Sequence, residues 1–218
     1  MMDVRQTICA VGKLLYDRGY VAANDGNLSV RTGENELWMT PSGVSKGRMT
    51  PELLVKLDLE GRVLEGERYP SSEARLHLAV YRRRRDVGAV VHAHPPVSTA
   101  FAACRRGLDI PYLAELVVGL GGAVPVAPYA ALGTDEVPRS IEPYVEEYDA
   151  VLLANHGAAA WGRDLWTAFD RLETVEHTAK IYRNIELLGG GCPLTPEQVR
   201  ALKDKQDHYR RLAGRREE

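Results

Sequence analysis

The segment VVHAHPPV, residues 90–97, joins an apolar run to two histidines one residue apart and then to two prolines. The apolar run predicts a short, mostly buried β-strand, which Pro95 and Pro96 end because proline cannot donate to a strand's hydrogen-bond ladder. Side chains alternate faces along a strand, so His92 and His94 project from the same side. Two imidazoles on one face can chelate a divalent ion, but two partly exposed residues at a strand end would show the same pattern.

A third histidine favours the metal site. His156 follows the apolar run of DAVLLANHG and precedes a glycine, so it also lies where a buried strand enters a loop. If this strand and the first one are neighbours, His92, His94 and His156 converge and leave an open coordination position, as a catalytic zinc-type site requires. His77 lies in a predicted helix, four residues after Glu73, and is interpreted as a structural residue or a supporting partner of the site.

Signals for helices and strands are mixed along the whole chain. Hairpin signals dominate the first third, where GNLSVR, ENELWMT and LLVKLDLEGRVLEG are separated by glycine-marked turns. The stretch AVPVAPY also resembles a strand, whereas the glycine-marked stretch after His156 is predicted to be a loop that leads into a long helix. Helices are predicted over residues 4–15, 71–84, 97–104, 113–122, 135–147 and 164–188, with a polar one beginning at 195. The mixture predicts one α/β domain whose mixed or largely antiparallel sheet is covered by helices.

The composition is that of an ordinary globular protein. The 218 residues suit one domain, with 44% apolar residues, 27% charged residues and a net charge of −2. One basic run, residues 82–85, has no aromatic partners, so no nucleic-acid partner is expected. The cysteines Cys9, Cys104 and Cys192 are widely scattered, which predicts a reducing compartment without a disulfide framework. No signal peptide and no apolar segment near the roughly 20 residues of a membrane span are recognised, so we expect a cytoplasmic protein without a membrane partner.

Three small polar clusters offer hydroxyls, amides and exposed backbone N–H groups. They are GNLSVR at residues 26–31, TPSG at 40–43 and SSE at 71–73, and each alone is more often a turn or a cap. Together they could hold a phosphate, especially Ser71 and Ser72 at a predicted helix N-terminus. The sequence has no Walker-type loop, so the phosphate would belong to a small substrate.

Glu73 follows the two serines directly. In one interpretation it is a first-turn glutamate that the helix dipole favours. In the other, it is a carboxylate between a phosphate pocket and a metal, where it acts as a ligand or moves a proton.

In this order, GNLSVR, TPSG, SSE, HAHP and NHG resemble the class II aldolase/adducin superfamily, and most closely its L-fuculose-1-phosphate aldolase branch. The resemblance extends from the first helix to the long helix after His156. It implies a single three-layer α/β/α domain over residues 1–218, with a central mixed, largely antiparallel sheet and a C-terminal helical tail at 193–218. It also implies a homotetramer whose active sites lie at subunit interfaces.

The resemblance assigns a role to each matching residue. His92, His94 and His156 would bind Zn²⁺, although imidazole also suits other divalent transition metals. Glu73 would be the acid/base group and a possible fourth ligand. The residues that would bind the substrate phosphate are Asn27, Ser42, Gly43, Ser71 and Ser72.

These roles predict a zinc-dependent aldolase of carbohydrate metabolism. It would reversibly cleave a fuculose-1-phosphate-like ketose 1-phosphate to dihydroxyacetone phosphate and a small aldehyde. Cleavage beside a carbonyl leaves an enediolate, whose charge a divalent ion stabilises, while Glu73 shuttles the proton.

One segment departs from the fuculose pattern. Where those aldolases bring a tyrosine from a neighbouring subunit, IPYLAELVVGLGG has Glu115, with Tyr112 three residues earlier. Both are candidates for acid/base work, and Tyr209 in the C-terminal helix either reaches an active site or packs the tail. A glutamate at position 115 also resembles the methylthioribulose-1-phosphate dehydratase branch, so dehydration of a sugar phosphate is one alternative reaction. The other is 4-epimerisation of a pentulose 5-phosphate, but the epimerases that share these motifs place an aspartate in the helix that begins with SSE, which this chain lacks. A non-catalytic adducin-like interaction module is least favoured, because the three histidines are retained.

Overall fold

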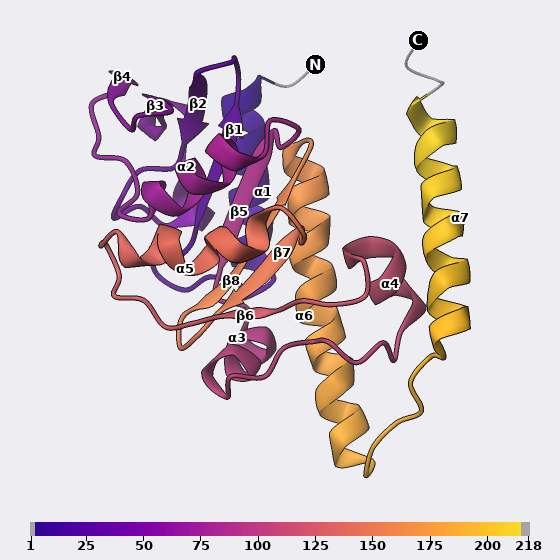
Figure 1. The fold of residues 1–218 in the computed structure, drawn as a ribbon. Helices are drawn as coiled ribbons and strands as arrows, with labels where there is room; N and C mark the ends of the chain where they lie inside the picture. Colours follow the sequence, from indigo (N-terminus) through magenta and orange to yellow (C-terminus); the bar gives the residue numbers. More distant parts are fainter. Residues whose placement is uncertain (1–2, 215–218) are drawn as a thin grey trace.

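The core of the molecule is one eight-stranded sheet with the order β4-β3-β2-β1-β5-β8-β7-β6 (Figure 1). The computed structural model describes the backbone of residues 3–214 and the side chains of residues 3–205. Every neighbouring pair of strands is antiparallel except β6 and β7, which are parallel. The strands are β1 (Asn27–Arg31), β2 (Glu36–Met39), β3 (Val55–Asp58), β4 (Val63–Glu65), β5 (Ala89–Ala93), β6 (Val126–Ala127), β7 (Ala150–Leu153) and β8 (Gly157–Gly162).

Helices cover both faces of this sheet and complete the three layers. They are α1 (Val4–Asp17), α2 (Ala74–Arg83), α3 (Pro96–Ala103), α4 (Ala114–Leu120), α5 (Glu136–Val145), α6 (Leu165–Leu187) and α7 (Pro196–Gly214), with short 3₁₀ turns at Lys46–Arg48 and Pro51–Leu53. The predicted fold class, an α/β/α sandwich around a mixed and largely antiparallel sheet, is confirmed.

Each face of the sheet has its own hydrophobic core. Val91 of β5 joins Ile8 of α1 and Leu172 of α6 in one buried cluster. Its neighbour Val90 points the other way and joins a second cluster that includes Leu76 of α2 and residues of α5. His92 has the same parity as Val90 and therefore lies on the face that α2 covers.

The prediction of a loop after His156 was wrong, because Gly157–Gly162 forms β8. This strand lies between β5 and β7, so the strands that carry the histidines are not direct neighbours as supposed. Its sequence, GAAAWG, has little of the β-branched character that predicts a strand. Small residues are needed there: a Cβ atom on Gly157 would lie 2.5 Å from the Ala93 oxygen and 2.6 Å from Cδ2 of His94.

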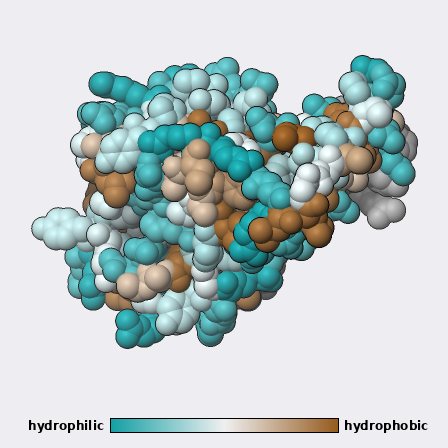
Figure 2. All heavy atoms as spheres, turned by 90° about the horizontal axis from the view of Figure 1, so that it is seen from below, coloured by the Kyte–Doolittle hydropathy of each residue, from teal (hydrophilic) through white to brown (hydrophobic). Residues whose placement is uncertain are grey.

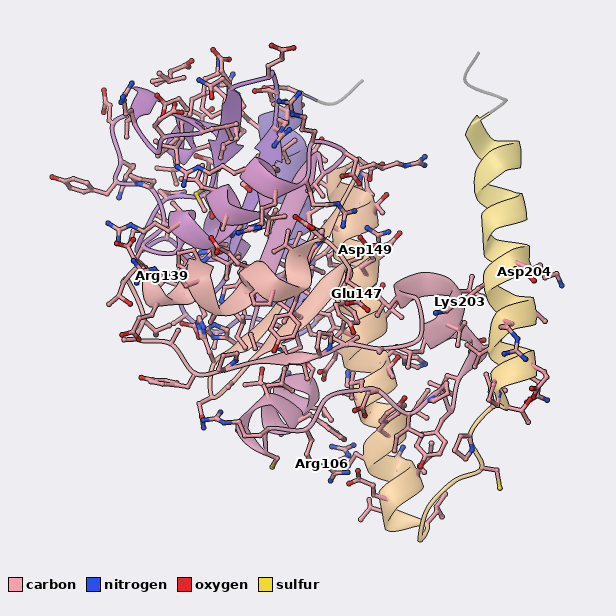
Figure 3. The ribbon with its side chains drawn as sticks, viewed as in Figure 1. Arg106, Arg139, Glu147, Asp149, Lys203 and Asp204 are labelled. Carbon is pink, nitrogen blue, oxygen red and sulfur yellow. The ribbon has the colours of Figure 1, made fainter. Side chains whose placement is uncertain are left out.

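Polar contacts fix the layers at one end of the sheet. Asp149 precedes β7 (labelled in Figure 3). It accepts from Arg84 at the end of α2 and from Arg171 of α6, at 3.2 and 2.6 Å. Because these helices cover opposite faces, the aspartate links both helical layers to the sheet. All three cysteines are free thiols.

The last two helices extend beyond the sheet. α7 runs beside α4 and projects away from the body of the molecule (Figure 1), with the charged Lys203 and Asp204 on it (Figure 3). Apolar residues such as Leu187 and Leu188 are exposed at the end of α6, and apolar surface gathers where the body meets the projecting part in the view from below (Figure 2). None of the helices within residues 3–214 combines the length and apolar character needed to cross a membrane.

Candidate metal centre and active site

Three histidines meet at the end of β5, as the sequence predicts. The ring centroids of His92, His94 and His156 lie 4.7–5.0 Å apart in pairs, and their ligand nitrogens all lie within 4.8 Å of one another. β5 carries His92, and His94 follows directly after it. His156 lies in the tight β7–β8 turn, where Asn155 adopts a left-handed backbone conformation with φ of 57°. The hairpin that the sequence did not predict therefore delivers the third imidazole.

The donor set fits a divalent metal. Nδ1 of His92 lies 2.9 Å from the Ala158 carbonyl oxygen, so it donates its proton there and leaves Nε2 with a free lone pair. Nε2 of His92 lies 3.1 Å from Nε2 of His94. Ligand atoms of a tetrahedral site with bonds of about 2.0–2.1 Å lie about 3.3 Å apart. These three side chains would hold the ion.

Glu73 closes the fourth side of the histidine cluster. Its two carboxylate oxygens lie 3.2 Å from Nε2 of His92 and 3.2 Å from Nε2 of His156. Oε1 is buried and accepts no hydrogen bond from the residues that the structure describes. A buried carboxylate oxygen needs a partner. A metal ion held by the three imidazoles, or a proton of the substrate, would supply it.

Charges within the cluster shift its pKa values in different directions. Burial by itself would raise the pKa of Glu73, but the charge of His92 and hydrogen bonds hold it well below its usual range. Burial acts to lower the pKa of His92, yet its contact with Glu73 raises that pKa overall. Burial, followed by repulsion from His92, lowers the pKa of His156 to about 4. The glutamate is therefore ionised at neutral pH, and His156 presents a free lone pair to a metal.

Asn27 belongs to the same site and contacts two of its residues. Its side-chain nitrogen donates to Oε2 of Glu73 at 2.8 Å, and its oxygen lies 2.6 Å from Nε2 of His77. The sequence interpretation placed His77 beside the site but gave it no contact. The link from His77 to Glu73 through Asn27 could be predicted only from knowing that α2 packs on β1.

The other residues predicted to bind phosphate lie on two adjoining segments. Ser42 N–H donates to the Tyr69 oxygen at 3.0 Å, and Ser71 N–H donates to the Thr40 oxygen at 3.2 Å. Ser42, Gly43 and Ser72 line one open cavity of about 670 Å³. Ser71 is buried next to this cavity and accepts from the Glu73 N–H at 3.3 Å.

Two charged residues near the site were not anticipated. Lys46 is almost fully buried, and its ammonium donates to the carbonyl oxygens of Asn24 and Val44, at 3.0 and 2.7 Å. Burial lowers the pKa of Lys46 to about 8. Asp25 lies 3.5 Å from Nδ1 of His94. The sequence gave little signal for either, because lysine and aspartate in polar turns are common on surfaces.

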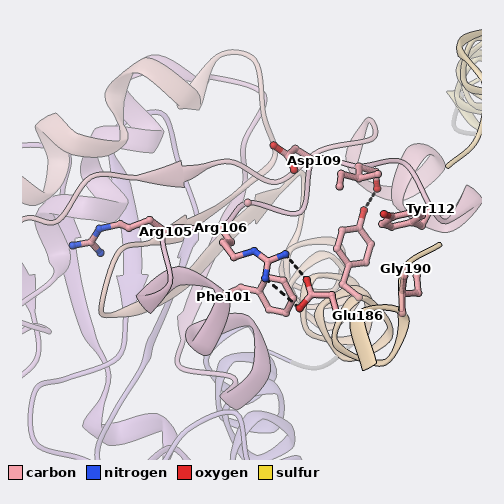
Figure 4. Close-up of a pocket in the computed structure, with 11 residues that line it drawn as sticks. Phe101, Arg105, Arg106, Asp109, Tyr112, Glu186 and Gly190 are labelled. Atoms are coloured by element: carbon pink, nitrogen blue, oxygen red, sulfur yellow. Dashed lines mark hydrogen bonds and ion pairs between the residues drawn. The ribbon is translucent and has the colours of Figure 1, made fainter. Parts of the chain in front are cut away.

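Tyr112 and Glu115 lie elsewhere in the chain. Tyr112 packs edge-to-face on Tyr182 at 5.2 Å and lines a separate cavity of about 330 Å³, beside an ion pair between Arg106 and Glu186 (Figure 4). Glu115 is exposed on α4, which packs mainly on α6 and α7. The predicted role of Tyr209 concerns a side chain outside the described residues. A single chain thus brings together the histidines, Glu73 and the segments predicted to bind phosphate, but not Tyr112 or Glu115.

Known proteins share this architecture. A family model described as class II aldolase and adducin N-terminal domain matches residues 6–183. The chain is 35% identical over 206 residues to the 5-deoxy-D-ribulose 1-phosphate aldolase of Bacillus thuringiensis, covering 94% of this chain and 96% of the relative. It is 36% identical over 187 residues to the 3-oxo-tetronate 4-phosphate decarboxylase of Haemophilus influenzae, covering 84% and 88%. A solved L-fuculose 1-phosphate aldolase superposes with a TM-score of 0.87 at 36% identity, covering 94% and 96%.

A three-layer α/β/α fold that brings a histidine cluster at its strand ends next to a glutamate at a helix start is that of an enzyme whose three histidines could hold a metal ion. The chain belongs to the class II aldolase and adducin family, as the sequence motifs indicated. Names among the similar proteins include an aldolase, a decarboxylase and a dehydratase, so membership alone leaves the reaction open.

Proposed function

We propose that the protein is a metal-dependent aldolase that reversibly cleaves a ketose 1-phosphate to dihydroxyacetone phosphate and a small aldehyde. One observation carries the proposal: the Glu73 carboxylate contacts two of the three converging imidazoles, and Glu73, the N-cap of α2, directly follows Ser71 and Ser72. This arrangement suits a proton-transfer group that works beside a metal site and a phosphate site. We expect zinc as the metal and the cytoplasm as the location.

The phosphate side orients the substrate. The hydroxyls of Ser42, Ser71 and Ser72 and the backbone N–H groups of Gly43 and Ser72 are proposed to hold the phosphate, beside the N-terminal end of the α2 dipole, since the N–H groups of Ser42 and Ser71 are already donated within the fold. Asn27 would contribute the second N–H of its amide, since the first is donated to Glu73. With the phosphate fixed, the reacting carbons lie beside Glu73 and the histidines.

The bond-breaking step needs one group to move a proton at carbon. Cleavage leaves the electron pair of the broken bond on the dihydroxyacetone phosphate half as an enediolate. Cleavage also releases the proton of the hydroxyl that becomes the aldehyde oxygen. A proton would reach the ionised Glu73 carboxylate through water, and Glu73 would deliver it to the enediolate carbon, so that no net proton is consumed. In the reverse direction Glu73 would remove the proton from that carbon. A bound divalent ion supplies positive charge that stabilises negatively charged oxygen in such a site.

The aldehyde half is proposed to meet residues of a second copy. Glu115 is exposed and lies away from the histidines of its own chain. In a homotetramer with active sites at subunit boundaries, Glu115, Tyr112 and Tyr209 would handle the proton on the aldehyde oxygen.

The test is a panel of ketose 1-phosphates with lactaldehyde, glycolaldehyde or acetaldehyde as the leaving half. Zinc-loaded protein is mixed with each compound, and dihydroxyacetone phosphate release is followed with a coupled reductase. Release from at least one member supports the proposal. Full retro-aldol activity in Glu73→Gln would contradict the role of Glu73.

Glu115 favours a second candidate, a lyase that removes water or carbon dioxide from a sugar phosphate. Relatives at 36% identity carry decarboxylase and dehydratase names, and a glutamate at this place suits proton transfer to a leaving hydroxyl. The same incubations decide between the two, because a dehydrated product or released carbon dioxide without dihydroxyacetone phosphate would select the second candidate. A 4-epimerase activity is not supported, because the helix that begins with SSE lacks the aspartate that the epimerases carry there. Stoichiometric metal that His92→Ala loses would argue against a non-catalytic adducin-like module.

A further inference from the structure

A buried row of polar side chains leads from the interior to Glu73. His77 and Tyr81 lie four residues apart on α2 and face Asn27 and Ser29, which lie two residues apart on β1. These spacings put each pair on one face of its element, so the helix and the strand meet along four polar residues. Asn27, Ser29, His77 and Tyr81 are all buried, at 0–3% exposure.

Four short hydrogen bonds connect the row. Tyr81 Oη lies 2.8 Å from Ser29 Oγ, which lies 2.7 Å from Nδ1 of His77. Nε2 of His77 lies 2.6 Å from Oδ1 of Asn27, whose Nδ2 lies 2.8 Å from Oε2 of Glu73. The row thus ends on the carboxylate that faces the histidine cluster.

The chemistry of the groups fixes the direction of every bond. An ionised carboxylate only accepts, so Asn27 presents its NH₂ group to Glu73 and its oxygen to His77. Nε2 of His77 must then carry the proton, which leaves Nδ1 to accept from the Ser29 hydroxyl. Ser29 in turn accepts from Tyr81. All four bonds donate toward Glu73.

We propose that His77 is a positioning residue, which holds the Asn27 amide so that its nitrogen faces Glu73 and the substrate. The inference rests on the proposed function for the identity of the reaction. The amide nitrogen has two protons, and only the first finds an acceptor among the described residues, in Glu73. The second is therefore free to bind a substrate oxygen, and His77 sets both contacts.

The opposite orientation of the amide is unfavourable for a physical reason. It would turn Oδ1 toward the Glu73 carboxylate and Nδ2 toward the Nε2 proton of His77, so that both new contacts repel. Without a donor at residue 77, the amide oxygen is buried without a partner and the amide is free to rotate. Burial also lowers the pKa of His77 to about 3, which keeps the ring neutral and its donor pattern constant near neutral pH.

Two matched substitutions separate positioning from packing. The Gln amide nitrogen reaches the place of Nε2, so His77→Gln keeps the donor to Asn27 and loses the contact with Ser29. Asn reaches only the place of Nδ1, so His77→Asn keeps the contact with Ser29 and loses the donor. We expect kcat of His77→Asn to fall by about 10–100-fold with a raised KM, as for other residues that orient a reacting group. His77→Gln should stay within about threefold of the natural protein.

Equal losses in the two variants, or full activity in His77→Asn, would overturn the proposal. A second measurement needs neither substrate nor metal: ¹⁵N-histidine NMR of the natural chain, with His77→Gln to assign the signal. We expect protonated Nε2 and unprotonated Nδ1, and the opposite tautomer would refute the proposed chain. If no ketose 1-phosphate is cleaved while this tautomer is found, the proposed function fails and the arrangement of His77 stands.

Discussion

The histidine centre and the α4 segment, residues 110–121, differ in how completely one chain builds them. In the centre, His92 is fully buried, Glu73 is 11% exposed, and hydrogen bonds run back into the interior. On the α4 segment, Glu115 is exposed, and α4 packs mainly on α6 and α7. The half proposed to bind metal and move the proton is thus built within a single chain, whereas the half expected to choose the aldehyde lies on a surface. A family can keep the first and vary the second, which suits relatives named for different reactions.

The largest effect is expected from removing a metal ligand. His92→Ala leaves two imidazoles, so bound zinc and activity should both be lost, the activity by more than about 10³-fold, because even one charge-stabilising hydrogen bond is worth about 10²–10³-fold. Metal content measured by mass spectrometry and the initial rate check this. His177→Ala is the control, since His177 lies exposed on α6. Equal metal content in the two variants would show that the cluster is not the metal site.

The second prediction tests whether Glu73 of the histidine centre and Glu115 of the α4 segment work in one active site. Glu73→Gln should lower kcat by about 10²–10⁴-fold, the usual contribution of a general acid or base, with metal content unchanged. Glu115→Gln should give a smaller loss. If the two residues work in one site from different chains, co-refolding the two impaired variants should give more activity than the average of the two separate variants.

The expected gain of activity in the co-refolded mixture has a simple structural reason. In a mixed oligomer, some subunit boundaries pair an intact Glu73 with an intact Glu115. Residues acting within the same chain can never be paired in this way. Mixed oligomers that stay as inactive as the separate variants would therefore break the proposed connection between the centre and the α4 segment.

The sequence predicted the centre better than its surroundings. His92 and His94 were placed by the alternation of a strand, and Glu73 by its position after two serines at a helix start. Such local rules depend on a few consecutive residues, so they survive without knowledge of the sheet. The order of the strands is not local, and it was here that the prediction failed.

β8 shows why. An alanine-rich strand between two glycines has no periodic signal, and its identity comes from the close approach to β5 at Gly157. Asn27 illustrates the same limit: its position in GNLSVR suggested a phosphate contact, but the partner of its oxygen is His77, 50 residues away. Burial of Lys46 likewise depends on two loops that meet only in the folded chain.

Lys46 gives the third prediction, on stability. Its pKa is lowered from 10.5 to about 8, so between these values the unfolded chain binds more protons than the folded one. Stability should therefore rise with pH across this window, by up to about 3 kcal/mol, and be lost again as the pH falls toward 8. Lys46→Met should lack this rise. Urea unfolding at pH 7.5 and 9.5, at one protein concentration, measures the difference, and equal pH slopes in the two proteins would refute the assignment.

The smallest predicted effect is a change in zinc affinity when Asp25 is replaced. Asp25 lies where the histidine centre meets the protein surface. Its carboxylate is 44% exposed and lies 3.5 Å from Nδ1 of His94, longer than a normal hydrogen bond. Partners of this kind orient a ligand imidazole and are worth about 10–100-fold in metal affinity, so Asp25→Asn should weaken zinc binding by about 10-fold, at the lower limit. Competition with a chromophoric chelator measures this, with the exposed Asp135→Asn as control. Unchanged zinc affinity in Asp25→Asn would mean that packing alone orients His94. The histidine centre would then bind metal without support from a surface carboxylate.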